Sequence, residues 1–325
     1  MDIARSAKIY KKIDLQHAYH LAQIAEGDEW KAAFQTQCEL FEWFIMPFEL
    51  TNTCAAFQQF VNDVSSNLLD KFMIIYLNNI LLYSDNLEMH IQHVQEFWCL
   101  HANRPFAHAG KCFFHTERVE NLGFLLSPEG LTMDLVVKVK AITEWPEPQK
   151  VKDVQSFLRF TNFYCCFIHR YSDIVTLMTH LTQKYIPWLW SDNCQSAFDS
   201  LKSAFSFAPI LSHFIPGALL IVEMDASDYA VTVILSMVTS DSEVHPIAFH
   251  SHTLGISKLN YDTHNKELLA IFEVFTTWRH YLKGSETLVD IITDHKNLEY
   301  FSTVHLLTQH QARWSELLSQ FNFMI

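Results

Sequence analysis

The sequence predicts an α+β fold, and two observations predict this class. Short runs of β-branched, aromatic and aliphatic residues, which are typical of strands, alternate with segments whose apolar residues recur at helical spacing. Hydrophobic residues make up 49% of the 325-residue chain and aromatic residues 14%. The chain can therefore bury cores in roughly two domains of ordinary size.

The N-terminal part of the chain predicts strands followed by two helices. Residues 9–45 alternate apolar and polar side chains in short runs, which indicates strands joined by the acidic turn at 25–29. A helix is predicted after the polar start signal at 51–53, because apolar residues recur at helical spacing from Phe57 to Leu68. A second helix is predicted over 87–101.

Between these helices, residues 72–84 read FMIIYLNNILLYS and predict a buried β-hairpin. Two apolar runs flank Asn78 and Asn79, and polar residues bound the whole segment. Asn tolerates the positive φ that a two-residue hairpin turn requires. We therefore expect the turn at this pair of asparagines.

Two proline-bearing stretches predict boundaries further along the chain. WPEP at 145–148 precedes a helix that begins near 151, and APILSHFIPGA at 208–218 separates helical from strand-rich sequence. Beyond it, three strand-like runs, a long helix over 261–282 and a strand over 288–294 predict a mixed sheet. A last helix is predicted over 308–321. The expected parts are 1–130, a helical region at 131–217, and 218–325.

Charge and cysteine content narrow the functional classes. The net charge of -13 disfavours strong nonspecific binding to nucleic acid, which depends on Lys and Arg. The seven cysteines include no CxxC pair, so we expect reduced, mostly buried thiols and no zinc ribbon. No apolar run reaches the roughly 18 residues of a membrane span, and no signal-peptide core is evident. The sequence predicts an intracellular protein, cytoplasmic or nuclear, without a membrane partner.

Three carboxylates in the last part could form a metal site. Asp225 ends the first predicted strand, Glu267 lies in the first turns of the long helix, and Asp294 ends the next strand. If the helix packs on the sheet, all three can converge near one edge, and converging carboxylates bind Mg²⁺ for phosphodiester cleavage. Acidic residues at the ends of strands and helices are also often merely solvated. Both interpretations stay open on this spacing.

The sequence segments around these three carboxylates indicate a function more specifically than their spacing does. VEMDAS, NKELLAI and TDHKNLEYF resemble, in order, the ribonuclease H domain of gypsy-like long-terminal-repeat retrotransposon polyproteins. Upstream, KIDLQHAYH, IAEGDEWKAAF, MPFELTN, AAFQ, YLNNILLYS, LGFLLSPEGLTMD and QSFLRFTNFY resemble the reverse transcriptase palm, thumb and connection of the same polyproteins. The resemblance runs from about residue 7 to 325.

The resemblance implies a role for each predicted part. Residues 1–130 would form the palm without its fingers subdomain, and 131–217 the thumb and connection. Residues 218–325 would form a ribonuclease H-like domain that is incomplete at its C-terminus. Its catalytic and metal-binding residues would be Asp225, Glu267 and Asp294, with Mg²⁺ or Mn²⁺ as cofactor.

The polymerase site implied by the resemblance is altered. In this family a Tyr-x-Asp-Asp turn and one aspartate on the KIDL strand bind two metal ions, whereas here Asp14 remains and Asn78 and Asn79 replace the pair. An amide carries no negative charge, so we expect polymerase activity to be lost. In the implied nucleotide pocket, Tyr19 is retained, and Glu49 replaces a glycine where its carboxylate would repel a triphosphate.

Two classes of function remain open. The first is a retrotransposon-derived reverse transcriptase and ribonuclease H with residual Mg²⁺-dependent cleavage of RNA in RNA–DNA hybrids. Its partner would be a hybrid or a template-primer, which the acidic charge would bind weakly. The second is a non-catalytic relic or interaction module. Gln, His, Cys and Glu stand where the family commonly has Arg or Gly, and single transitions in the gene explain each change, which predicts a degenerate copy.

Histidine pairs offer a weaker metal signal. His250 and His252 flank a serine on a predicted strand, and His90 and His93 are three residues apart on a predicted helix. Both spacings suit a zinc pair. No third ligand is evident near either pair, so the sequence favours plain exposed faces for all four side chains.

Overall fold

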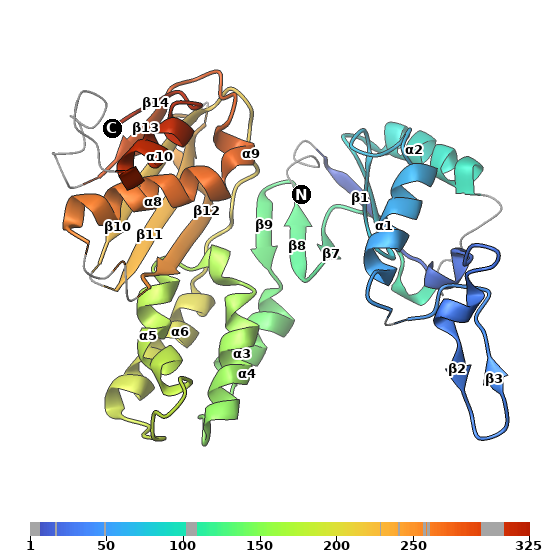
Figure 1. Ribbon diagram of the computed structural model, residues 1–325. Helices are drawn as coiled ribbons and strands as arrows, with labels where there is room; N and C mark the ends of the chain where they lie inside the picture. Colours follow the sequence, from blue (N-terminus) through green and yellow to red (C-terminus); the bar gives the residue numbers. More distant parts are fainter. Residues whose placement is uncertain are drawn as a thin grey trace. The chain divides into compact units, whose positions relative to one another are not determined.

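The computed structural model describes residues 7–16, 18–48, 50–101, 109–227, 229–239, 241–255, 258, 261–293 and 309–325. The chain divides into two compact units, Met1–Pro128 and Glu129–Ile325. In Figure 1 the N-terminal unit runs from blue to green and the C-terminal unit from green to red. The further division of the chain at 217 stays a prediction.

A four-stranded sheet in the order β4-β5-β1-β6 forms the centre of the N-terminal unit. Strand β1 pairs antiparallel with β5 from Ile9 opposite Ser84 to Asp14 opposite Asn79. Two helices pack beside this sheet, as the sequence predicts. The bounds are β1 Ile9–Asp14, α1 Thr53–Val64, β4 Met73–Tyr76, β5 Asn79–Ser84, α2 Leu87–His101 and β6 Phe113–Thr116.

The core of this unit lies between the sheet and its helices. Helix α1 buries Phe57 and Val61 on one side, and α2 buries Phe97, which confirms the helical spacing in the sequence. Val64 departs from the predicted face, because α1 ends there and its side chain is exposed. The strand residues of the same core are Ile13, Met73, Ile75, Ile80 and Leu82.

Between β1 and α1, the structure differs from the predicted strands. The chain forms two 3₁₀ helices and one short hairpin there. The hairpin pairs only Phe34 with Phe41 and Gln35 with Leu40, and it projects from the rest of its unit (Figure 1). The apolar side chains that alternate along this hairpin are exposed and do not form a buried sheet face. The rings of Phe34 and Phe41 stack on each other, with 5.6 Å between their centroids. The bounds are η2 Ala18–Leu21, η3 Glu29–Ala32, β2 Phe34–Gln35 and β3 Leu40–Phe41.

The predicted hairpin at 72–84 is present, but its turn lies one residue earlier than expected. Tyr76 pairs with Asn79, so the two turn residues are Leu77 and Asn78, and Asn79 is the first residue of β5. The positive φ of the turn, 52°, belongs to Leu77. The expectation that an asparagine takes this conformation was wrong, because contacts from outside the hairpin hold Leu77 in it.

A five-stranded mixed sheet in the order β12-β11-β10-β13-β14 forms the centre of the C-terminal unit. The first three strands are antiparallel, and β13 pairs parallel with β10 after the crossover helix α8. This arrangement confirms the mixed sheet that the sequence predicts. The bounds are β10 Leu219–Ala226, β11 Ala230–Val238, β12 Val244–Thr253, α8 Thr263–Thr277, α9 Arg279–Leu282, β13 Val289–Ile292, α10 Gln309–Leu318 and β14 Phe323–Met324.

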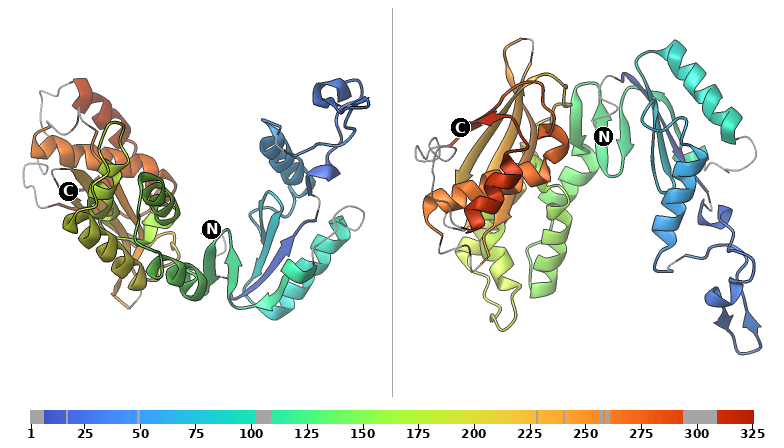
Figure 2. Two further views of the ribbon diagram at one scale, coloured as in Figure 1. Left: turned by 90° about the horizontal axis from the view of Figure 1, so that it is seen from below. Right: turned by 45° about the horizontal axis from the view of Figure 1, so that its top comes forward.

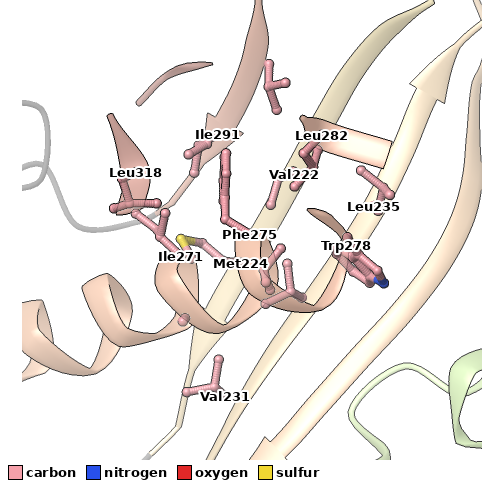
Figure 3. Close-up of a cluster of buried hydrophobic side chains, with 14 of the residues drawn as sticks. Val222, Met224, Val231, Leu235, Ile271, Phe275, Trp278, Leu282, Ile291 and Leu318 are labelled. Atoms are coloured by element: carbon pink, nitrogen blue, oxygen red, sulfur yellow. The ribbon is translucent and has the colours of Figure 1, made fainter. Parts of the chain in front are cut away.

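Helix α8 covers one face of this sheet. Figure 3 shows Ile271 and Phe275 of α8 directed at Val222 and Met224 of β10, and all four side chains are buried. Every second residue of a strand points to the same face, so the α8 face of β10 carries Leu220, Val222 and Met224. Helix α10 lies alongside α8 (Figure 2).

Helices from the 131–217 region cover the opposite face. The backbone N–H of Ser172, at the start of α5, donates to Ser251 Oγ of β12 at 2.9 Å. The neighbouring residue His250 points to the other face, where its ring lies against Trp278 at the end of α8. The bounds are β9 Gly130–Met133, η5 Leu135–Val139, α3 Lys140–Thr143, α4 Val151–Asn162, η6 Cys165–Phe167, α5 Tyr171–Leu181 and α6 Asp192–Ser206. No described helix is long and apolar enough to cross a membrane.

The N-terminal unit also contains shorter elements on either side of β6. A short 3₁₀ helix, η4 Ala109–Lys111, precedes β6, and β7 Val119–Asn121 pairs antiparallel with β8 Phe124–Ser127.

All seven cysteines are free thiols. The expectation that most are buried was wrong, because Cys38, Cys54 and Cys99 lie on exposed positions of the hairpin and of two helices and only Cys194 is fully buried.

Candidate functional site

The predicted polymerase residues lie together in the N-terminal unit. Asp14 is the last residue of β1 and pairs with Asn79 across the sheet, while Asn78 lies in the adjoining turn. The side-chain amide of Asn78 donates to Asp14 Oδ2 at 3.5 Å, and the amide of Asn79 donates to Asn78 Oδ1 at 3.3 Å. The three side chains therefore form one hydrogen-bonded row that ends on the only carboxylate among them.

The chemistry of this row does not fit a pair of divalent ions. Mg²⁺ is bound in proteins by oxygen ligands, chiefly carboxylates, and two such ions need several negative charges between them. Here one carboxylate is present, and it accepts a hydrogen bond from the side-chain amide of Asn78. The residues present can hold the turn together, but they do not supply the charge for two metal ions.

Helix α1 fixes the same turn through Gln58. The backbone N–H of Leu77 donates to Gln58 Oε1 at 2.8 Å, and the amide of Gln58 donates to the carbonyl of Ile75 at 3.3 Å. The backbone N–H of Leu15 also donates to the carbonyl of Asn78 at 2.8 Å. No role for Gln58 was predicted from the sequence, although this residue ends the AAFQ segment that carries part of the resemblance.

The predicted nucleotide-pocket residues are only partly described. Tyr19 lies in η2 rather than in a strand, and its ring contacts Phe57 at 4.8 Å and Phe48 at 5.3 Å. Burial, followed by the contact of its hydroxyl with Cys54 Sγ at 3.7 Å, raises the pKa of Tyr19 above its usual value. Glu49 lies outside the described residues.

In the C-terminal unit, Asp225 lies near the end of β10 and forms an ion pair. Its Oδ2 atom is 3.3 Å from a terminal nitrogen of Arg170, and both side chains are about half-exposed. Met224, the preceding residue, faces α8, so the Asp225 side chain leaves the strand on the opposite face. Arg170 directly precedes α5, which covers that opposite face.

Glu267 makes a different contact, from α8. It is 2% exposed, and Thr293 Oγ1 donates to its Oε2 at 2.7 Å. Thr293 directly follows β13, so the carboxylate of Glu267 is tied to the end of this strand. Asp294, the next residue, lies outside the described residues. Whether the three predicted carboxylates meet therefore stays a prediction.

The donor chemistry of Asp225 and Glu267 fits a hard divalent ion. Both supply carboxylate oxygens, which Mg²⁺ and Mn²⁺ prefer. A third oxygen lies beside Asp225, because Thr232 is its direct cross-strand partner and points to the same face. Thr232 is 2% exposed, and within the described part of the chain its Oγ1 atom has no hydrogen-bond partner.

One group of metal-ligand type was not predicted from the sequence. Asp241, Glu243 and His245, on the loop between β11 and β12 and the start of β12, place their ligand atoms within 4.8 Å of one another. It is the only such group of three among the residues that the structure describes. Its carboxylates are exposed, and exposed groups of this kind are common without an ion.

The prediction that His90 and His93 lie on a plain exposed face was wrong. His90 is fully buried, and Ser84 Oγ lies 3.0 Å from Nδ1 of His90 and 2.8 Å from Nδ1 of His93. Helix α2 turns this face toward β5, so the two rings share one hydroxyl. Burial, and next His115 and Lys11, lower the pKa of His90 to about 4.

Comparisons with known proteins agree with this arrangement. Residues 1–126 match the family described as reverse transcriptase (RNA-dependent DNA polymerase), and residues 190–289 match the RNase H-like domain found in reverse transcriptase. The chain is 31% identical over 324 residues to the Tf2-7 and Tf2-3 transposon polyproteins of Schizosaccharomyces pombe. These matches cover 99% of this chain and 24% of each polyprotein, so the chain spans about a quarter of their length.

Two solved structures share the fold. The foamy viral protease-reverse transcriptase in complex with RNA/DNA hybrid matches 99% of this chain and 44% of its own, with a TM-score of 0.82 and 18% identity. The same viral protein in complex with dsDNA matches 99% of this chain and 68% of its own, with a TM-score of 0.80 and 19% identity. At this level of identity the likeness concerns the fold alone.

Proposed function

Because the chain belongs to the reverse transcriptase family of retrotransposon polyproteins, with an RNase H-like domain after the polymerase region, we propose that it has lost RNA-directed DNA polymerase activity. The observation that carries this proposal is the row of hydrogen bonds from Asn79 through Asn78 to Asp14. It leaves one carboxylate where polymerisation needs enough negative charge for two ions.

The expected loss is large. Removing one group that stabilises charge in a transition state commonly lowers the rate by about 10²–10³. Here the negative charges of two carboxylates are absent, because Asn78 and Asn79 are amides. The third carboxylate, Asp14, is already engaged by a hydrogen bond from Asn78. We therefore expect no measurable primer extension.

Primer extension by the full chain tests this proposal. The natural chain is compared with the double variant Asn78→Asp/Asn79→Asp in Mg²⁺ and in Mn²⁺, and with the same variant carrying Asp14→Asn. We expect extension from neither the natural chain nor the triple variant, and we expect the double variant to bind more metal ion than either of them. Extension by the natural chain would refute the proposal.

We further propose that the chain binds an RNA–DNA hybrid or a template-primer duplex. The fold relatives solved with an RNA/DNA hybrid and with dsDNA support this choice of partner. The net charge of -13 opposes binding, so the affinity is expected to be weak and to fall steeply with salt. Fluorescence anisotropy of a labelled hybrid across a salt series measures it, and binding that does not depend on salt would contradict this expectation.

A second candidate function is cleavage of the RNA strand in such a hybrid. The carboxylates of Asp225 and Glu267 support it, with Asp294 as the third proposed ligand. These residues would hold Mg²⁺ or Mn²⁺, which when bound activates water and stabilises charge on the phosphate. The buried position of Glu267 and its bond from Thr293 would orient one ligand.

Cleavage of a labelled hybrid tests this function in the same reactions as primer extension. Cutting that requires the metal and that Asp225→Asn abolishes would establish a working nuclease. No cutting by a folded sample would leave the alternative, a non-catalytic relic or interaction module. Circular dichroism of each sample shows whether the chain is folded.

A further inference from the structure

The guanidinium group of Arg170 lies between two carboxylates of the C-terminal unit. Its Nε atom donates to Asp173 Oδ2 at 3.1 Å, and a terminal nitrogen lies 3.3 Å from Asp225 Oδ2. Asp173 belongs to the first turn of α5, and Asp225 to the end of β10. One cation therefore links the helix to the strand end that carries a proposed metal ligand.

The backbone holds Arg170 in this place. Arg170 has φ 57° and ψ 30°, a left-handed conformation that residues other than glycine rarely adopt. The first turn of α5 is fixed on the sheet by two further contacts, because Ser227 Oγ donates to Asp173 Oδ1 at 2.8 Å and the N–H of Ser172 donates to Ser251. The chain thus turns sharply at Arg170 and directs its side chain to the end of β10.

We propose that Arg170 is the resident counter-cation of Asp225, and that a divalent ion gains this carboxylate when the guanidinium moves to a phosphate of the nucleic-acid backbone. The inference rests on the proposed cleavage function and deepens it. It makes Arg170 a positioning residue that couples metal binding to substrate binding.

Charge and exposure support this exchange. A guanidinium and a divalent ion cannot share one carboxylate oxygen without repelling each other, so binding of one disfavours the other. Guanidinium also binds phosphate with two parallel hydrogen bonds, which makes a backbone phosphate a suitable second partner. Both Arg170 and Asp225 are about half-exposed, and ion pairs at such positions are weak enough to exchange.

The unsatisfied hydroxyl of Thr232 adds an independent observation. A buried polar atom without a partner is uncommon, and this one lies beside Asp225 on the same face. Thr232 is the direct cross-strand partner of Asp225, so the unsatisfied hydroxyl belongs to the residue next to the carboxylate that the guanidinium would leave. A hydrated divalent ion at Asp225 could bind the carboxylate directly and reach the hydroxyl through water.

Binding of Mn²⁺ to the full chain tests the proposal without any turnover. The electron paramagnetic resonance signal of free Mn²⁺ reports the bound fraction in the natural chain, in Arg170→Gln and in Arg159→Gln. Arg159 lies exposed on α4, so its variant makes the same change of charge elsewhere. Arg170→Gly serves as a second variant, because glycine favours the left-handed backbone and the chain should fold at least as well.

We expect Arg170→Gln and Arg170→Gly to bind Mn²⁺ about three- to fivefold more tightly than the natural chain, as befits a half-exposed pair. Arg159→Gln should show no such gain, and adding Asp225→Asn to Arg170→Gln should remove it. A hybrid of DNA with uncleavable 2′-O-methyl RNA should tighten Mn²⁺ binding to the natural chain and not to Arg170→Gln, after subtraction of Mn²⁺ bound by the hybrid alone.

Equal affinities in the Arg170 and Arg159 variants, or a gain that survives Asp225→Asn, would overturn the proposal. The cleavage assay separates this failure from that of the nuclease. Cleavage that needs Asp225 but no gain in Mn²⁺ affinity would refute the exchange and leave the nuclease. A gain through Asp225 without cleavage would support the exchange and refute the nuclease.

Discussion

Gln58 accepts the backbone N–H of Leu77 at 2.8 Å, so helix α1 holds the β4–β5 turn by a contact that involves neither asparagine. This contact does not depend on the charge at Asn78 and Asn79, so it remains available to the turn when aspartates are restored at these positions.

Removing this contact should destabilise the N-terminal unit. Gln58→Ala leaves the N–H of Leu77 and the carbonyl of Ile75 without their side-chain partner, which should lower the free energy of unfolding by about 1–3 kcal/mol. Urea unfolding measures the difference. The neighbouring exposed Gln59→Ala is the matched control, and equal stability of the two variants would contradict the role of Gln58.

Gly130 should tolerate no side chain. A Cβ atom there would lie 2.3 Å from the carbonyl oxygen of Leu211, and the φ of Gly130 is +148°. The two backbone hydrogen bonds between Leu131 and Leu211 prevent the chains from separating. We expect Gly130→Ala to cost about 2 kcal/mol or more of unfolding free energy.

Gly27→Ala provides the comparison for that variant. Gly27 also has a positive φ, +87°, but no atom lies within 4 Å of its would-be Cβ. Gly27→Ala should lower the free energy of unfolding only because alanine disfavours a positive φ, by about 1 kcal/mol. Chemical unfolding that ranked Gly27→Ala as the more harmful change would show that Leu211 does not constrain Gly130.

Acid should destabilise the N-terminal unit through His90. Its pKa is lowered to about 4 by burial and by the nearby His115, Lys11 and His93, against a usual value of 6.5. A lowered pKa means that the folded state resists protonation. The contribution is fully present above about pH 6.5 and is lost as the pH falls toward about 4, for a total of roughly 3 kcal/mol.

The variant His90→Asn removes this titration while keeping a polar group near Ser84. Its unfolding free energy should therefore fall less than that of the natural chain between about pH 7 and about pH 4.5. Exposed His180→Asn serves as the control. The same pH dependence in all three proteins would exclude His90 as the source.

The buried hydroxyls of Thr161 and Tyr171 should be coupled. They lie 2.9 Å apart and join α4 to α5, and burial raises the pKa of Tyr171 above its usual range. Each single change, Thr161→Val or Tyr171→Phe, leaves one buried hydroxyl without this partner. A double-mutant cycle should give a coupling of about 1 kcal/mol, and additive effects would show that the contact contributes nothing.

Periodic burial made most of the C-terminal sheet predictable. In β10, Leu220, Val222 and Met224 alternate with exposed or half-exposed residues, and the same rule in α8 places Ile271 and Phe275 on one face. Such patterns are local, so they can be read from the sequence. The turn at Leu77 could not, because the bond that holds it comes from another helix.

The candidate site shows the same limit. Asp225 and Glu267 could be proposed as metal ligands from the sequence segments that contain them, VEMDAS and NKELLAI. The ion-pair partner of Asp225 could not be predicted in this way. Arg170 reaches Asp225 only because α5 docks across β12 and β11, and no spacing along the chain reports that contact. The burial of His90 has a related origin, since α2 packs this face on β5, and the pattern of its own helix does not report that contact.

The parallel pairing of β13 with β10 has a consequence for how the C-terminal unit is assembled. Strands β10, β11 and β12 follow one another through short connections, but Val289 meets Leu220 only after α8 and α9 have crossed the sheet. Contacts between distant residues slow folding more than they weaken the final state. We therefore expect the closing of β13 onto β10 to limit the refolding rate, and a chain emerging from the ribosome to complete its hairpins well before this sheet.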